Sequence, residues 1–218
     1  MIGFLSDFLP DLLAGLTVNL QIAGLALLLG TAAAVPLVAL RLRGGAARSA
    51  ARGLGALLWA SPTFVVMFFL VNVVPERWNL AGITVHFSSL AVIVVSQAVF
   101  ATAFLTDSGL EAVRHLRAGR HGSALLFLPQ AASAFFIMVT SSSQAAAIGV
   151  LDAVAVTLRA GERLPDVRQR LLLFIAVVLL FVLIQRMAFH VIDRCRSALL
   201  RGFGARDSSK ETSHARKA

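Results

Sequence analysis

The chain has 218 residues, of which 58% are hydrophobic and only 14% are charged. A soluble domain carries about 25% charged residues, so this composition excludes a separate water-soluble domain. The formal net charge of +9 does not indicate a nucleic-acid partner, because the arginines follow apolar stretches, as in the cytoplasmic loops of membrane proteins. The single cysteine, Cys195, excludes an intrachain disulfide and thiol-pair redox chemistry.

Five apolar stretches alternate with short polar connections. A membrane span needs about 20 mostly apolar residues, and tilt or snorkelling covers a shortfall. The stretches are Leu12–Leu40, Leu54–Val74, Leu90–Leu105, Ala124–Val150 and Leu171–Ile192. They predict an all-α, polytopic membrane protein with five transmembrane helices. Residues 1–203 are its transmembrane domain, and the polar residues 204–218 are expected to form a disordered cytoplasmic tail.

The distribution of arginine predicts the orientation of the chain in the membrane. The first connection, Arg41–Arg52, holds four arginines and no acid, and the positive-inside rule places it in the cytoplasm. Five crossings then give an outside N-terminus and an inside C-terminus. The fourth connection, Thr157–Arg170, also carries four arginines although it must lie outside; the first loop has the greater weight. The predicted location is a membrane that the chain crosses several times.

Polar side chains recur inside the predicted spans, where they are costly unless they face protein or water. Pro62 lies in the second span and leaves a backbone carbonyl without its usual donor. The largest polar group is the run Thr140–Gln144 in the fourth span. For each such side chain, an interhelical hydrogen bond and a place on a transport path both remain open interpretations.

The sequence lacks the motifs of catalysis inside a membrane. It contains no HExxH or similar metal-ligand spacing, no Gly-x-Ser-x-Gly elbow and no phosphate-binding Gly-x-x-x-x-Gly-Lys-Ser loop. We therefore expect no metal site and no enzymatic activity, and the chain cannot hydrolyse a nucleotide alone.

The third connection carries the most specific pattern. It extends from Gly109 to Gln130, and its informative elements are Glu111-Ala112, Gly119 and Leu128-Pro129-Gln130. This resembles the cytoplasmic coupling segment of ABC importer permeases, in which Glu-Ala-Ala begins a short helix, a glycine follows, and Leu-Pro opens the next span. A proline suits the first turn of a helix, where its missing N–H has no partner to lose.

Three other stretches are similar to the amino-acid branch of that family, in the same order: Gly15–Gln21, Trp59–Phe64 and Ile148–Asp152. The chain departs from the family in a coupling connection about two helical turns shorter. It also has Ala60 where the family has arginine, and Thr140–Ser143 where the family commonly has Lys-Asp-Thr-Ser.

The resemblance implies a type I ABC importer permease-like fold and a transmembrane subunit of an ATP-driven importer for a polar amino acid or related small solute. The implied partners are a second permease subunit (the same or homologous), a cytoplasmic ATPase dimer, an extracytoplasmic solute-binding protein and membrane lipids. ATP and Mg²⁺ would bind to the ATPase, and no cofactor to this chain. The implied location is the inner (cytoplasmic) membrane of a bacterium.

The resemblance also assigns residues to two roles. The residues implied to couple to the ATPase are Glu111, Ala112, Arg114, Gly119 and Pro129. The candidates for the translocation path are Asn19, Gln21, Ser61, Thr63, Gln97, Ser141, Ser142, Ser143 and Gln144. Two alternatives stay open. One is a degenerate permease-like subunit that pairs with an intact permease and serves structurally or in regulation; the other is an unrelated membrane assembly factor or enzyme.

Overall fold

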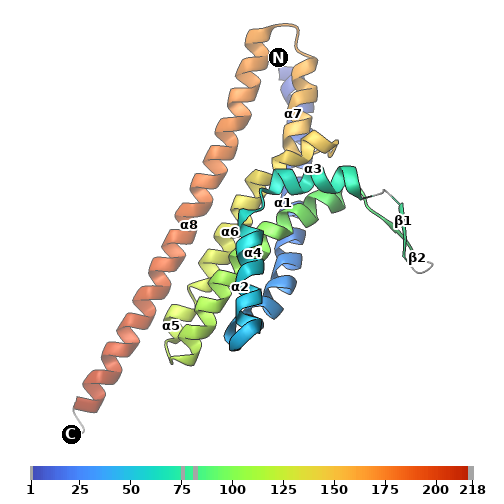
Figure 1. Cartoon of the computed structure of the whole chain (residues 1–218). Coiled ribbons are helices and arrows are strands. Elements are labelled where there is room, and N and C mark those ends of the chain that lie inside the picture. The colour runs from blue at the N-terminus through green and yellow to red at the C-terminus, as the bar shows by residue number, and fades with distance from the viewer. Residues whose placement is uncertain (1, 75–76, 81–82, 216–218) are drawn as a thin grey trace.

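The computed structural model describes residues 2–74, 77–80 and 83–215, and they form a bundle of long helices with one short hairpin (Figure 1). Helices α1 (Ile2–Leu42) and α4 (Ser89–Arg117) pack along each other in the bundle. Small residues make this packing possible: a Cβ added at Gly30 would lie 2.4 Å from the Cβ of Ala101. Close backbone approach through small residues is the usual basis of helix packing in lipid.

Four described helices are each long and apolar enough to cross a membrane, and a bent pair brings the number to five if it counts as one span. The pair is α2 (Gly45–Ala60) and α3 (Thr63–Val73), which meet at an angle of 91°. Ser61 is extended, because a residue before proline is pushed out of the helical region, and Pro62 caps α3. The Ser61 hydroxyl donates to the Leu57 carbonyl (2.8 Å) beside the break. The multi-pass helical fold is therefore confirmed, with four candidate spans and a fifth if the bent pair crosses the membrane as a broken span rather than as a re-entrant loop.

The second connection contains the one departure from an all-helical chain among the described residues. Strands β1 (Arg77–Leu80) and β2 (Ile83–His86) pair antiparallel, with Arg77 opposite His86 and Leu80 opposite Ile83. The run Ile-Thr-Val favours a strand because its residues are β-branched. The hairpin extends away from the bundle (Figure 1).

The predicted fourth span is divided rather than continuous. It consists of α5 (His121–Ala124), α6 (Phe127–Ser141) and the 3₁₀ helix η1 (Ser142–Ile148). The Ser142 hydroxyl donates to the Val139 carbonyl three residues earlier (2.7 Å), which favours the tighter 3₁₀ winding. Gly149 then takes a left-handed conformation (φ +84°) and ends the helix.

Two further helices complete the chain. Helix α7 (Ala153–Glu162) lies beside the N-terminal part of α1, and α8 (Val167–Ala215) runs along one side of the bundle (Figure 1). The sequence predicts a disordered tail over 204–218, whereas α8 continues to Ala215 and residues 216–218 lie outside the described residues. No proline follows Pro165, so the helix has no strong stop, and extending a formed helix costs far less than starting one.

Candidate functional site

Asn19, near the middle of α1, is the centre of a buried polar junction. Its Nδ2 donates to the Ser142 hydroxyl (2.8 Å) and to Oδ2 of Asp152 (3.3 Å), and its Oδ1 accepts from the Ala153 N–H (3.1 Å). All three side chains are fully buried. We call Asn19, Ser142 and Asp152 the Asn19 junction. It joins α1 to the start of η1 and to the start of α7.

Asp152 is also the N-cap of α7. Its Oδ1 accepts from the Ala155 N–H (2.8 Å), the role that favours aspartate before a helix. The residue follows the candidate span that ends at Ile148. Burial raises the pKa of the Asp152 carboxyl, and the hydrogen bonds from Ala155 and Asn19 oppose that rise. Asp152 is not among the path candidates; an aspartate before a helical run is the sequence signal that marks it.

Gly15 lets the two helices of this junction touch. A Cβ added there would lie 2.7 Å from the Ala153 nitrogen and 2.8 Å from the carbonyl carbon of Asp152. The backbones of α1 and α7 therefore meet directly, and only glycine fits.

A second polar pair lies between α4 and the end of α6. The Ser141 hydroxyl donates to Oε1 of Gln97 (3.1 Å), and Gln97 is fully buried. The Nε2 of Gln97 and the Oε1 of Gln144 are both buried without a hydrogen-bond partner in the described part of the chain. These unpaired amide atoms are groups that a polar ligand or a water would satisfy.

Four of the nine path candidates therefore pair with each other: Asn19 with Ser142, and Gln97 with Ser141. The other five lie apart or exposed. Gln21 is exposed on α1, Ser61 is bonded at the break before α3, and Thr63, Ser143 and Gln144 are half-buried. The interhelical hydrogen bond is thus observed for four residues, while a transport role for any of the nine stays a prediction.

The coupling candidates do not form a helix of their own. Glu111, Ala112 and Arg114 lie within α4, because nothing interrupts that helix before Gly119. There the Gly119 N–H bonds to the Leu116 carbonyl (3.0 Å) and the Arg120 N–H to the His115 carbonyl (2.9 Å). With Gly119 left-handed (φ +72°), this is the Schellman ending. The expectation of a short helix that begins at Glu111 is corrected accordingly.

Between α4 and α6 the structure has only the four-residue α5. Glu111 is exposed and its carboxylate lies 3.6 Å from Nε2 of His115. Pro129 is buried in the first turn of α6, where its missing N–H costs nothing.

A charged junction joins α1, α2 and α4 at the far end of α1. The Arg41 guanidinium pairs with the Asp107 carboxylate, and Arg41 Nε donates to the Ala51 carbonyl (3.3 Å). The indole Nε1 of Trp59 donates to Oδ2 of Asp107 (2.7 Å). We call Arg41, Trp59 and Asp107 the Arg41 junction. Sequence reasoning missed it, because Arg41 and Asp107 are 66 positions apart and share no local pattern.

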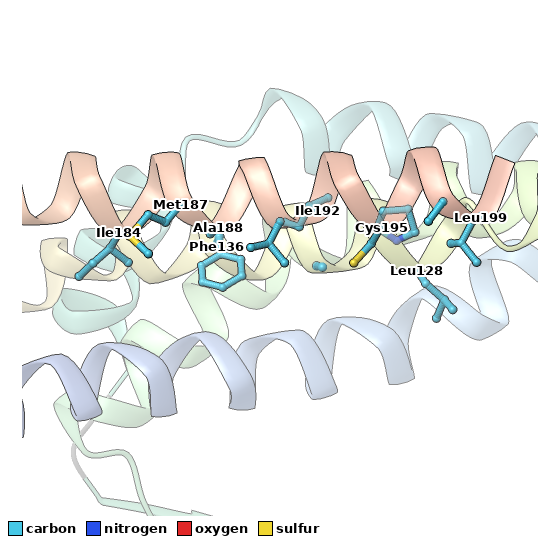
Figure 2. A pocket seen from close by; sticks show the side chains of 12 residues that line it. Leu128, Phe136, Ile184, Met187, Ala188, Ile192, Cys195 and Leu199 are labelled. Atoms are coloured by element: carbon cyan, nitrogen blue, oxygen red, sulfur yellow. The ribbon is translucent and has the colours of Figure 1, made fainter. Parts of the chain in front are cut away.

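The largest hollow described is apolar. A groove of about 1150 Å³ lies between α6 and α8, and Figure 2 shows Phe136, Met187, Ile192 and Cys195 along it. Its twelve lining side chains carry no charge, so it offers an apolar chain a surface but gives a polar solute little to bind.

Comparison with known proteins supports the fold. No protein-family model matches the sequence, and no curated protein matches it. Among solved structures, the chain is similar to one described as an amino acid ABC transporter with histidines. The TM-score is 0.69 at 11% sequence identity, over 89% of this chain and 96% of the other. The protein therefore has the multi-pass helical fold of that ABC transporter chain, and the fold implied by the resemblance is confirmed.

Proposed function

We propose that this chain is a transmembrane permease subunit of an ATP-driven importer for a polar amino acid or a related small solute. The observation that carries the proposal is the backbone similarity to an amino acid ABC transporter over 89% of the chain. Because one fold can host many functions, the proposal rests also on the order of the sequence fragments, from Gly15–Gln21 to Ile148–Asp152.

In this proposal the chain itself is no enzyme and holds no cofactor. It pairs with a second permease subunit, receives solute from an extracytoplasmic binding protein, and contacts an ATPase dimer that binds ATP and Mg²⁺. Its N-terminus is outside and its C-terminus inside a bacterial inner membrane, as the arginines of the first connection favour. The ATPase biases a bundle that has two arrangements, and it can do so only by contacting them differently.

The connection between α4 and α6 is the surface that this contact would use. Glu111 is exposed near the end of α4, and Gly119 ends that helix. Among the path candidates, Gln97 has the best support for contact with a solute, because it is fully buried and its amide nitrogen has no partner in the described part of the chain. Ser141, which donates to the Gln97 side chain, lies beside it.

The shortness of α5 favours a second candidate function. Four residues offer a docking partner less surface than a separate coupling helix. A degenerate permease-like subunit, which pairs with an intact permease without coupling to the ATPase itself, fits that observation.

One purification and one variant separate these functions. We expect the chain, purified in mild detergent, to bring down an ATPase and a second permease subunit. In vesicles of the purified assembly, Glu111→Ala should lower ATP-dependent uptake of a labelled amino-acid mixture about tenfold, a loss of about 1.4 kcal/mol. Glu162→Ala is the matched control, because Glu162 is an exposed acid at the end of α7, and uptake should not change.

Each other outcome has a distinct meaning. If both partners co-purify and Glu111→Ala transports like the original chain, the degenerate subunit is the correct function. If no ATPase co-purifies, the importer proposal is wrong and an assembly factor or membrane enzyme takes its place.

A further inference from the structure

A pocket lined by arginines lies where α1 and α4 end. Its volume is about 410 Å³, and its lining residues come from α1, α2 and α4: Arg41, Leu42, Arg48, Arg114, Arg117 and Ala118. We call this the arginine pocket. The apolar stretches Leu12–Leu40 and Leu90–Leu105 both end before these residues, so we expect the pocket to lie on the headgroup side of the hydrocarbon core.

The positive charge of the pocket is not balanced within the described residues. Arg41 is paired with Asp107, whose other oxygen accepts from Trp59. The remaining acid on the same part of α4, Glu111, pairs with His115.

No described carboxylate pairs with the other three arginines of the pocket, Arg48, Arg114 and Arg117. Arg48 donates to the carbonyls of Arg41 (3.3 Å) and Arg43 (3.0 Å) at the end of α1. It is thereby held against the helix end, and its charge is not neutralised. Three guanidiniums that share one hollow without an acid favour an anion with several oxygens.

A separate groove of about 300 Å³, lined almost entirely by apolar side chains, lies on the same two helices, and Phe127 of α6 completes its lining. Val38 lines the groove and Leu42, four residues on, lines the pocket; Val113 and Arg117 have the same relation on α4. Residues four apart are neighbours on one face of a helix. The groove is also open to the surroundings, since Val35 in its lining is 63% exposed.

We propose that the arginine pocket binds the phosphate of an anionic phospholipid headgroup, with an acyl chain of that lipid along the adjoining groove. Basic pockets between membrane helices are suited to such headgroups. A soluble phosphate would use the pocket and leave the groove empty, and an acidic protein surface would do the same. The apolar groove beside the pocket therefore favours a lipid over both.

Lipid titration followed by native mass spectrometry tests the proposal. The full chain, with any chains that co-purify, is titrated with dioleoyl-phosphatidylglycerol and with dioleoyl-phosphatidylcholine, which carries the same phosphate beside a cation. We expect phosphatidylglycerol to bind about tenfold more tightly, because each arginine near an anionic headgroup adds attraction. Equal affinity for the two lipids would overturn the proposal.

Paired variants locate the binding. The double variant Arg114→Gln/Arg117→Gln should bind phosphatidylglycerol about tenfold more weakly. Arg52→Gln/Arg120→Gln removes the same charge from exposed positions that do not line the pocket, and it should bind as the original chain does. If the double variant does not fold, Arg117→Gln is compared with Arg120→Gln. We then expect Arg117→Gln alone to weaken the affinity for phosphatidylglycerol, by about threefold. Equal binding by both members of a pair would overturn the assignment.

The remaining measurements distinguish a phospholipid from a soluble phosphate and from a protein surface as the ligand of the pocket. If inorganic phosphate alone stabilises the chain to heat as much as phosphatidylglycerol does, the ligand is a soluble anion and the lipid is the wrong source. If phosphatidylglycerol binds only after a co-purified ATPase is removed, the pocket is a protein docking surface. Val35→Trp fills the groove, so it should weaken the binding of dioleoyl-phosphatidylglycerol more than that of the short-chain dihexanoyl form. An equal effect on both lipids would show that the acyl chain does not lie in the groove.

Discussion

The two junctions that α1 makes differ in burial and in charge. Asn19, Ser142 and Asp152 are fully buried, and both polar atoms of the Asn19 amide have partners. In the Arg41 junction the Asp107 side chain is 46% exposed and the Arg41 side chain 11%, so water and salt reach the ion pair from the Asp107 side. A buried, satisfied group of hydrogen bonds specifies one arrangement, whereas an exposed ion pair is weak and easily exchanged.

If the proposed function is correct, we expect this difference to decide which end of the bundle moves. The Asn19 junction ties three segments together and changes only if several bonds break at once. The Arg41 junction lies beside the connection between α4 and α6, the surface proposed to meet the ATPase. A motion that enters there would exchange weak contacts near Arg41 and pivot about the fixed contacts near Asn19, in the manner of a hinge.

The variant Asn19→Leu gives the largest expected effect and tests whether the Asn19 junction is the more stable of the two. The variant leaves the Ala153 N–H buried without its partner and removes the amide donor from one oxygen of Asp152. Each orphaned buried group costs about 1–3 kcal/mol, although hydrogen bonds between membrane helices average only about 0.6 kcal/mol. We expect the free energy of unfolding, measured by titration with a denaturing detergent, to fall by about 3 kcal/mol. Gln21→Leu, exposed two residues on, should change it little, and an equal loss in both would contradict the role of the junction.

A matched pair of glycines on α1 gives the next largest effect. Gly15→Ala places a methyl group 2.7 Å from the Ala153 nitrogen, and overpacking costs about 1–3 kcal/mol. Gly24→Ala meets nothing within 4 Å and should leave the free energy of unfolding unchanged or raise it by up to about 1 kcal/mol. In the same unfolding assay we therefore expect a loss for Gly15→Ala and no loss for Gly24→Ala. A neutral Gly15→Ala would show that α1 and α7 are farther apart than described.

The fold is largely predictable from the sequence because the membrane demands long apolar stretches. All five predicted spans correspond to described helices, with the second broken at Pro62. The break is a local effect of one proline, but the 91° angle depends on what α2 and α3 pack against. The pairing of Arg77–Leu80 with Ile83–His86 was not predicted, since a short connection between spans has no hydrophobic face that requires strands.

The site is predictable only in part, because its partners are distant in the chain. Polarity within a span singles out Asn19, Gln97, Ser141 and Ser142, and the structure pairs all four. Nothing in the spacing shows that Asn19 meets Asp152, 133 positions later. In the sequence, Arg41 is one of several arginines in a basic connection. Only the packing of α1 against α4 brings it to Asp107.

The smallest expected effect is the loss of stability in Asp107→Asn, and its dependence on salt tests how far the Arg41 junction is open to solvent. Asp107→Asn removes the charge that faces Arg41 and keeps an oxygen that can accept from the Trp59 indole. We expect a loss of at most about 1 kcal/mol in the free energy of unfolding at low salt, and a smaller loss at high salt, because ions screen exposed charges. Asp193→Asn on α8, an exposed acid, serves as the control and should show no loss.

The same salt series on Asn19→Leu completes this test. Its loss should not depend on salt, since the Asn19 junction is shielded from solvent. If salt left the Asp107→Asn loss unchanged, the Arg41 junction would be as shielded as the Asn19 junction. The end of the bundle near α5 would then be as fixed as its middle, and a coupling motion that enters there would have to break buried contacts.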